Sequence, residues 1–457
     1  MIDDVRLAPD ELEAAGIRTV VVATPDLQGR LVGRRIPVEG FGRVVANGVD
    51  ICTCAWAWDI EQGLGLIEGN HFALCGMQNG VPDVTLVPDL DTLRPAAWLD
   101  GVAICLADPV DVKTHEPMAL SPRVILKQEL ARLRGLGLTP LAGTELEFYL
   151  FKNEPRQLRQ SGFRDLDPTT LIPSDFMIHE GNVYEPFFQK LRSDLRASGI
   201  LVEAAQSEWG TGQWEMTFEY GDPLEMADRH ALYKLAVRDS AARAGMSATF
   251  MARPLNGQPG SSCHVHVSFI DEAGTPVFWD EQAPEHMSDT MRSAVAGALE
   301  HAPGLMGWYA PTINSYRRNN SDEVAGNGRT WGFDNRTTSV RVVGHSAGAL
   351  RFEFRLPGAD TNPYFTLTGV LASARDGIEK STPAPEPVRG SAYDLPADEA
   401  MPRHLGEAAA AFASSELVAS ILDEESIRHQ RILLDHEWNT FLAAVSDWDL
   451  ARYFDRI

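Results

Sequence analysis

The segment Gly-Thr-Glu-Leu-Glu-Phe-Tyr-Leu-Phe, residues 143–151, predicts a β-strand whose side chains alternate between two faces. Glu145 and Glu147 would share one face, while leucine and phenylalanine side chains line the other. Two carboxylates on an otherwise apolar strand repel each other and lose hydration, so a cation is expected between them. We expect that cation to be a divalent metal ion.

Three later segments repeat this pattern. Residues 264–268 read His-Val-His-Val-Ser and residues 351–356 read Arg-Phe-Glu-Phe-Arg-Leu, while residues 208–216 place Glu208 and Glu215 around a bend that contains glycine. A single alternating strand is typical of any half-solvated antiparallel sheet. Four segments that each carry Glu, His or Arg at the alternating positions favour a metal-lined face instead.

Ligands that are mostly carboxylates, with one imidazole, suit Mg²⁺ or Mn²⁺ better than zinc or copper. Such metals usually hold phosphates, and guanidinium groups also bind phosphates and carboxylates well. A series of arginines accompanies the acidic segments: Arg318, Arg336, Arg341, Arg351 and Arg355. The chain has no glycine-rich phosphate loop ending in Gly-Lys, and Glu68 occupies the third glycine position of a dinucleotide fingerprint at residues 63–69. ATP would therefore be held by metals and arginines.

Composition narrows the possible partners. The chain has 457 residues and a formal net charge of -24, and its pI is near 4.9, which argues against nucleic acid or an anionic membrane as partner. Its five cysteines are odd in number and lack zinc-type spacing, as in a reducing compartment. The N-terminus lacks a basic and apolar leader, and no apolar run is long enough for a membrane span. These features predict a cytoplasmic protein.

Two domains are predicted along the chain, residues 1–112 and 113–457. The first would contain a short acidic helix at 8–16 and strands at 17–23, 29–37, 83–87 and 101–107. Ser121 followed by Pro122 predicts the start of a helix that opens the second domain. In that domain the acidic strands would alternate with helices near 224–244, 286–302 and 363–378, followed by a mainly helical region at 405–457.

The segment Gly-His-Ser-Ala-Gly, residues 344–348, fits the nucleophile elbow of an α/β-hydrolase. That elbow must open a helix, whereas the residues that follow, 350–355, are strand-like. A tight turn between two strands is the favoured interpretation.

The chain resembles the glutamine synthetase family, bacterial type I branch, over nearly its whole length. Its first acidic strand is similar to the first metal strand of the family, and the other family segments follow in order. The matching segments are Glu208 through Glu215, Gly260 through His266, Asn314 through Arg318, Asn335 through Arg341, and Glu353 through Pro357.

This resemblance implies an α+β fold. A small N-terminal β-grasp-like domain would precede a large glutamine synthetase-type catalytic α/β domain, in which an antiparallel sheet carries the metal ligands. It implies two or more metal ions per site, Mg²⁺ or Mn²⁺. One metal would lie on Glu147, Glu208 and Glu215, and a second on Glu145, His264 and Glu353.

The resemblance also implies roles for residues around the metals. His266, Arg336 and Arg341 would face phosphate, Arg318 and Gly260 would hold glutamate, and Arg355 would meet glutamate or the transferred phosphoryl group. Arg351 would lie on the substrate and nucleotide side, Glu203 and Ser268 would contact the nucleotide, and Glu323 would stand in for a flap glutamate.

The implied activity is that of an ATP-dependent ligase. Glutamate attacks the γ-phosphate of ATP to give γ-glutamyl phosphate, and an amine then displaces phosphate. Such enzymes form homo-oligomers of the dodecamer type, with active sites between subunits. A non-catalytic paralogue of the same fold is disfavoured because all six metal-ligand positions are intact.

Three departures from the family pattern concern the acceptor. Pro259 replaces an asparagine, the Asp-Gly-Ser-Ser segment that binds ammonium is not recognisable, and residues 319–325 replace the usual flap. Trp56 and Trp58 stand where the ammonium-site aspartate is expected, as aromatic walls for an organic amine or as core or subunit-contact residues. We therefore predict an organic amine or a polyamine as acceptor, the alternative being an ammonia-using glutamine synthetase.

One tyrosine could be a modification site. Residues 393–396 resemble the adenylylation segment of the family, although an exposed turn at Tyr393 is the simpler interpretation.

Overall fold

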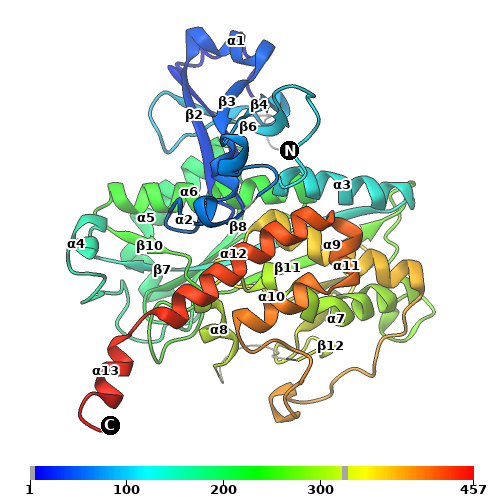
Figure 1. The fold of residues 1–457 in the computed structure, drawn as a ribbon. Coiled ribbons are helices and arrows are strands. Elements are labelled where there is room, and N and C mark those ends of the chain that lie inside the picture. Colours follow the sequence, from blue (N-terminus) through cyan, green and yellow to red (C-terminus); the bar gives the residue numbers. More distant parts are fainter. Residues whose placement is uncertain (1–5, 71, 322–327) are drawn as a thin grey trace.

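The computed structural model describes residues 6–70, 72–321 and 328–457 (Figure 1). Within these ranges the chain forms a six-stranded sheet near the N-terminus and an eight-stranded sheet further along. The N-terminal sheet projects from the larger body, which holds most of the helices (Figure 1). Among the helices of the described residues, none combines the length and apolar character needed to cross a membrane.

The N-terminal sheet has the strand order β2-β1-β6-β4-β3, with β5 pairing with β6. β1 and β6 pair in parallel, and the other pairings are antiparallel. Its strands are β1 (Thr19–Pro25), β2 (Leu31–Pro37), β3 (Val49–Cys52), β4 (Asp83–Pro88), β5 (Arg94–Pro95) and β6 (Val102–Asp111). The four strands predicted in this region are confirmed, with ends shifted by up to four residues.

This region differs from the sequence prediction at one expected helix and at the unpredicted elements α1 (Val38–Asn47), β3, β5 and α2 (Gly65–Gly69). The helix expected at 8–16 is wrong, because residues 9–16 form turns. Leu12 is the one buried residue of this stretch, and so short a segment lacks the apolar contacts that would stabilise a helix. Helix α1, which buries Phe41 and Val44, was not predicted.

The larger sheet has the strand order β12-β13-β14-β11-β7-β9-β8, with β10 pairing with β7. β12 and β13 pair in parallel, and the other pairings are antiparallel. Its strands are β7 (Thr139–Phe151), β8 (Val202–Ser207), β9 (Gln213–Phe218), β10 (Ser247–Thr249), β11 (Cys263–Ile270), β12 (Trp331–Phe333), β13 (Val340–Val343) and β14 (Arg351–Phe354).

The predicted helices of the larger part are confirmed. Ser121 caps α3 by accepting a hydrogen bond from the Val124 amide, and Pro122 is its first residue. The confirmed helices are α3 (Pro122–Gly135), α6 (Pro223–Arg243), α7 (Asp289–Tyr309) and α9 (Pro363–Lys380), and the helical region after residue 405 contains α10 (Leu405–Ala413), α11 (Glu416–Ile421), α12 (Glu424–Ala443) and α13 (Asp447–Tyr453). The helices α4 (Pro155–Gln160), α5 (Ile178–Ala197) and α8 (Ile313–Asn319) were not predicted.

Helices α6, α7 and α9 contribute to one large core together with the apolar side chains of the sheet. Leu146, Phe148 and Leu150 of β7 are fully buried in this core. Because side chains alternate along β7, the opposite face of the strand is left for Glu145 and Glu147. The domain boundary at residue 112 and the β-grasp-like assignment stay predictions; β6 ends at Asp111 and α3 begins at Pro122.

Candidate active site

Strand β7 places its acids between two neighbouring strands, β9 and β11. Glu145 lies opposite His264 of β11 and Thr217 of β9, and Glu147 lies opposite Glu215 of β9. In this register the acids and the imidazole point to the same face of the sheet. The predicted pairing of Glu145 and Glu147 on one face is confirmed.

Glu147, Glu208 and Glu215 form a group that we call the three-glutamate cluster. One oxygen from each lies within 4.8 Å of the others. Glu147 and Glu215 are 8% and 7% exposed. Burial raises the pKa of both carboxyls, and the charge of a neighbouring glutamate raises each further. Among the described residues no lysine or arginine forms a salt bridge with the cluster, so its charge calls for a bound cation.

Two neighbours orient Glu147. The Gln213 side-chain amide and the Ser262 backbone amide donate to its Oε2 at 2.8 and 2.9 Å. Gln213 also donates to the Gly260 carbonyl at 3.0 Å, which fixes the amide in place. Since both donors use Oε2, the other oxygen of Glu147 can serve a metal.

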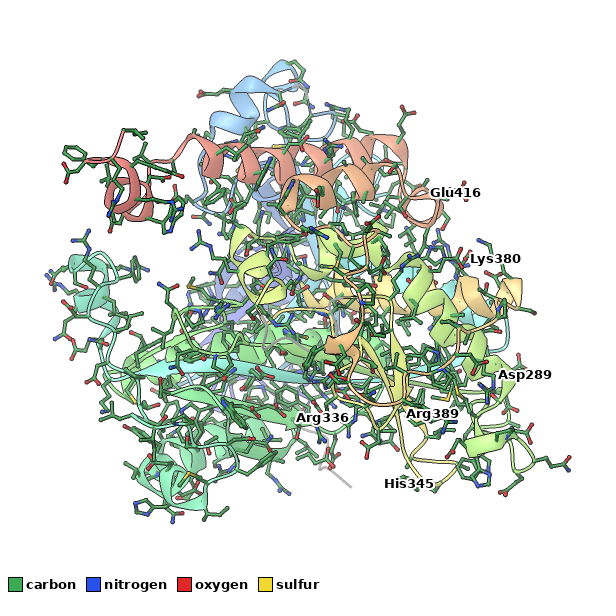
Figure 2. The ribbon with its side chains drawn as sticks, turned by 90° about the horizontal axis from the view of Figure 1, so that it is seen from below. Asp289, Arg336, His345, Lys380, Arg389 and Glu416 are labelled. Atoms are coloured by element: carbon green, nitrogen blue, oxygen red, sulfur yellow. The ribbon has the colours of Figure 1, made fainter. Side chains whose placement is uncertain are left out.

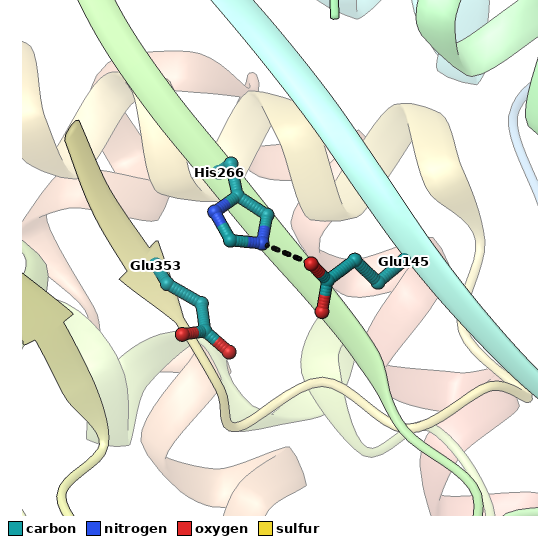
Figure 3. A group of neighbouring side chains, drawn as sticks. All are labelled: Glu145, His266 and Glu353. Carbon is teal, nitrogen blue, oxygen red and sulfur yellow. Dashed lines mark hydrogen bonds and ion pairs between the residues drawn. The ribbon is translucent and has the colours of Figure 1, made fainter. Parts of the chain in front are cut away.

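Glu145, His266 and Glu353 form a second group, the glutamate–histidine cluster, whose ligand atoms also lie within 4.8 Å of one another (Figure 3). His266 Nε2 is 2.8 Å from Glu145 Oε1. His264 Nδ1 lies 3.4 Å from Glu145 Oε2 and 3.3 Å from Glu353 Oε1. Both imidazoles therefore border this group, whereas the resemblance assigned His264 to the metal and His266 to phosphate.

The protonation of the two histidines follows from their neighbours. Arg351 Nε donates to His266 Nδ1 at 3.0 Å, so Nε2 carries the proton that faces Glu145. Burial, followed by the charge of Arg355, lowers the pKa of His264 to about 4. His264 is thus neutral near pH 7, which is the form that binds metals.

Glu353 is held by two arginines. Arg355 Nη1 contacts Glu353 Oε1, and Arg341 Nη1 lies 3.0 Å from Glu353 Oε2. Arg341 also contacts Asp334 at 2.5 Å. Arg355 Nε is buried without a hydrogen-bond partner among the described residues. These guanidinium groups stand beside the glutamate–histidine cluster, where they could neutralise phosphate charge.

Arg318 is 2% exposed and anchored by the backbone. Its Nη1 donates to the Leu356 carbonyl at 2.8 Å, and its Nη2 donates to Ser262 Oγ at 2.9 Å. Gly260 packs against it so closely that an added Cβ would lie 2.5 Å from Arg318 Cγ. A larger residue at position 260 would therefore displace the arginine.

One predicted residue of the described chain lies outside the clusters. Arg336 is exposed, and within the described part of the chain it makes no hydrogen bond or ion pair (Figure 2). Glu323 lies outside the described residues. Their roles stay predictions.

Glu203, Ser268, His266 and Arg351 line one cavity of about 230 Å³. Glu145 also lines it, so the cavity opens onto the glutamate–histidine cluster. Residues that the resemblance assigned to the nucleotide and to phosphate are thus brought to one place. A nucleotide whose base and sugar lay beside Glu203 and Ser268 could direct its phosphates toward the acids.

Gln213 and Ser262 are site residues for which the sequence predicted no role. Gln213 lies inside the family-like segment Glu208 through Glu215 and is 1% exposed on β9. The sequence signal that could have identified it is a glutamine two residues before Glu215 in that segment. Ser262 lies inside the family-like segment Gly260 through His266, and its hydroxyl accepts a hydrogen bond from Arg318 Nη2.

Three further expectations can be judged. Trp56 is 1% exposed in the core of the N-terminal sheet, so the core alternative fits it rather than an acceptor wall. Trp58 packs against the same core.

Residues 344–350 connect antiparallel β13 and β14, which confirms the turn and contradicts the hydrolase elbow. Tyr393 is 48% exposed in a short 3-10 helix, as an exposed turn tyrosine would be.

Comparison with known proteins places these features in context. The sequence model described as "Glutamine synthetase, catalytic domain" matches residues 119–453. A γ-glutamylethanolamide synthetase of Streptomyces coelicolor is 38% identical over 449 residues, which cover 98% of this chain and 95% of the relative. A glutamate–isopropylamine ligase of a Pseudomonas species is 34% identical over 451 residues, covering 98% and 97%. The solved structure of ligand-free GmaS is 26% identical with a TM-score of 0.84, covering 98% of this chain and 99% of that one.

Proposed function

The chain belongs to the glutamine synthetase family, and on that premise we infer that it is an ATP-dependent ligase that joins the γ-carboxylate of glutamate to an organic amine. The observation that carries the choice of acceptor is the pair of relatives at 38% and 34% identity, both named for organic amines. The missing ammonium segment and the altered flap agree with it. The ammonia-using alternative has less support.

The reaction has two steps. The γ-carboxylate of glutamate attacks the γ-phosphorus of ATP, which forms γ-glutamyl phosphate and releases ADP. The neutral amine then attacks the acyl carbon and expels phosphate, leaving a γ-glutamylamide. In both steps the protein orients the substrates and neutralises the developing charge, and no covalent bond between substrate and protein is needed.

The donor sets of the two clusters fit Mg²⁺ or Mn²⁺. Glu147, Glu208 and Glu215 offer only carboxylate oxygens, and Glu145 and Glu353 offer two more beside an imidazole. We assign one ion to the three-glutamate cluster and a second to the glutamate–histidine cluster, with the neighbouring neutral His264 as its nitrogen ligand. When bound, such ions neutralise phosphate charge during phosphoryl transfer.

The arginines divide into two groups. Arg318, buried beside Gly260 and Ser262, is assigned to the substrate glutamate. Arg341, Arg351 and Arg355 surround the glutamate–histidine cluster and are assigned to phosphates, with Arg336 at the exposed rim. Glu203 and Ser268 are assigned to the nucleotide because they line the neighbouring cavity.

The proposed acceptor is tested by measuring phosphate release with glutamate, ATP and a panel of amines: ammonia, methylamine, isopropylamine, ethanolamine, aniline and polyamines. An organic amine is expected to give the highest kcat/KM. Ammonia as the best acceptor would overturn this proposal and leave a glutamine synthetase. The Glu353→Gln variant, with one ligand removed, is the background control.

We also propose that the chain forms a homo-oligomer of the dodecamer type in the cytoplasm. Large apolar side chains are exposed in two stretches, including Leu171, Phe176 and Ile178 in one and Trp448 and Phe454 in the other. Such exposure is typical of surfaces covered by another chain. All five cysteines are free, as in a reducing compartment. Light scattering tests the assembly, and a fully active monomer would contradict it.

A further inference from the structure

A second, larger cavity of about 950 Å³ lies away from the metal-binding clusters. It is bounded by residues 27–31 and 59–61 of the N-terminal part and by helices α6, α8 and α12, and we call it the α6–α12 cavity. No residue of either acid cluster lines it. Its volume is at the upper end of the range found for small-molecule sites.

Helix α6 presents two cations to this cavity, Lys234 and Arg238, which are four residues apart and therefore on one face. Arg238 is exposed to the cavity, and its guanidinium lies 5.6 Å from the centre of the Phe250 ring. Within the part of the chain that the structure describes, Arg238 forms no hydrogen bond or ion pair. It is thus a cation held over a ring without an anionic partner.

Lys234 adds a second positive charge to the side of the cavity formed by α6. Its ammonium group donates to the carbonyls of Ala359 at 2.6 Å and Thr361 at 3.2 Å, which leaves one of three protons available. Burial, followed by the charge of Arg238, lowers the pKa of Lys234 to about 8, so the two cations are close neighbours. A carboxylate between them would relieve this repulsion.

Another part of the cavity wall is acidic. Asp59, Glu61 and Glu437 line it, and His436 contacts Asp59 at 3.4 Å. Burial raises the pKa of Glu437, and Asp59 and Glu61 add to the effect although His436 opposes it. The cavity is therefore lined in one place by two cations, of which Lys234 has Asp360 as a nearby acid and Arg238 forms no ion pair among the described residues, and in another by crowded acids.

The remaining lining is mostly apolar, with Leu235, Phe250, Met251, Phe365 and Leu434 among its members. An occupant must therefore combine a carboxylate, a cationic group and an apolar body. A free amino acid with an apolar side chain has all three.

We propose that the α6–α12 cavity binds a zwitterionic amino acid with an apolar side chain, whose carboxylate meets Arg238 and Lys234 and whose ammonium group faces the acids. The site would be distinct from the glutamate pocket yet linked to it. Arg317 lines the cavity, and the next residue of α8 is the buried Arg318 of the active site. The proposal does not depend on the acceptor amine.

Calorimetric titration tests this site with three matched probes. They are phenylalanine, phenylalaninamide, which lacks the carboxylate, and 3-phenylpropionate, which lacks the ammonium group. Phenylalanine is expected to bind saturably, 3-phenylpropionate more weakly, and phenylalaninamide weakest, because the cationic wall carries the unpaired groups. No saturable binding of phenylalanine, or equal binding of the amide, would overturn the proposal.

Variants locate the binding. Arg238→Met keeps the apolar stem beside Phe250 and should weaken phenylalanine binding at least about tenfold. Arg238→Lys, which keeps the charge, should lose less, and Arg196→Met on exposed α5 should change nothing. Arg318→Met should also leave phenylalanine binding intact. Binding that survives Arg238→Met but is lost in Arg318→Met would place the ligand in the glutamate pocket and refute the assignment.

Discussion

Two groups of three buried or partly buried carboxylates differ in how their charge is balanced. In one, here called the junction cluster, Arg123 contacts Asp89, Asp108 and Asp228 at 2.8, 2.9 and 3.0 Å. Lys127 also contacts Asp89 at 3.0 Å and Asp108 at 2.5 Å. In the other, the three-glutamate cluster, the described residues supply no paired cation.

The location of each group explains the difference. The junction cluster links the N-terminal sheet to helices α3 and α6, and Tyr364 donates to Asp228 at 2.7 Å. Each of its acids contacts Arg123 or Lys127, so removing the buried cation would leave an uncompensated charge in the protein interior. The three-glutamate cluster lies near Arg318, the arginine that we assign to glutamate, and no paired cation among the described residues neutralises its acids. In these two groups, the acids that lack a paired cation are the proposed metal ligands, whereas the paired acids join parts of the scaffold.

The largest expected effect separates these two roles. Glu215→Gln should lower phosphate release by about 10³–10⁴-fold, roughly 4–5 kcal/mol of transition-state stabilisation, because a metal ligand is lost. The free energy of unfolding of the metal-free protein should stay the same or increase, since one of three repelling charges is gone. Activity is measured by phosphate release and stability by denaturant unfolding.

The exposed Glu219 just after β9 supplies the matched control, and Glu219→Gln should behave as wild type. Undiminished activity in Glu215→Gln would remove the metal assignment. A large loss of stability in the metal-free variant would mean that the cluster is scaffold after all.

The reverse pattern is expected at the junction cluster. Arg123→Met should lower the free energy of unfolding by about 3 kcal/mol, because it leaves the buried Asp228 without its cation, although Lys127 still contacts the other two aspartates. Arg18, whose side chain is 68% exposed and pairs with Asp100 at 2.7 Å, gives the control. Arg18→Met should change stability by less than about 1 kcal/mol. Equal stability of the two variants would show that the junction cluster does not stabilise the fold.

Metal addition should distinguish the clusters next. A divalent ion at about 100 times its Kd should raise the stability of the wild type by about 2.7 kcal/mol, because it binds the folded state alone. Thermal unfolding with and without Mg²⁺ or Mn²⁺ measures the shift. Glu215→Gln should lose most of it, whereas Arg123→Met should keep it. If neither Mg²⁺ nor Mn²⁺ changed the Tm of the wild-type protein, the proposed metal sites would be contradicted.

The sequence predicted those features that depend on local periodicity. Alternation along residues 143–151 was enough to put Glu145 and Glu147 on one face, and the helix starting at Pro122 followed from its cap. Both signals lie within a few residues of the structure they determine.

Features set by packing between distant segments were not predictable in this way. The position of both imidazoles beside Glu145 depends on the register between β7 and β11, and the resemblance alone separated His264 from His266. From the sequence, Trp56 could be either an aromatic wall of the acceptor site or a core residue. Its burial depends on packing with distant strands of the N-terminal sheet, which only the structure shows. The turns at 9–16 also depend on missing tertiary contacts rather than on propensity.

The smallest expected effect tests the link between the three-glutamate cluster and Arg318. Ser262 joins them, since its backbone amide donates to Glu147 Oε2 at 2.9 Å and its hydroxyl accepts from Arg318 Nη2 at 2.9 Å. Ser262→Ala keeps the amide and removes the hydroxyl. Arg318 retains the carbonyls of Leu356 and Arg355 as acceptors, so the loss should be about 1 kcal/mol.

That loss should appear as an increase of about fivefold in the KM for glutamate, with kcat and the metal-induced rise in Tm unchanged. Ser261→Ala is the adjacent control, because Ser261 Oγ contacts Gln213 at 3.4 Å and not Arg318. If Ser262→Ala weakened metal stabilisation as much as glutamate binding, the serine would act on the cluster rather than on the arginine. An unchanged KM would instead mean that the two backbone carbonyls orient Arg318 without help from the hydroxyl.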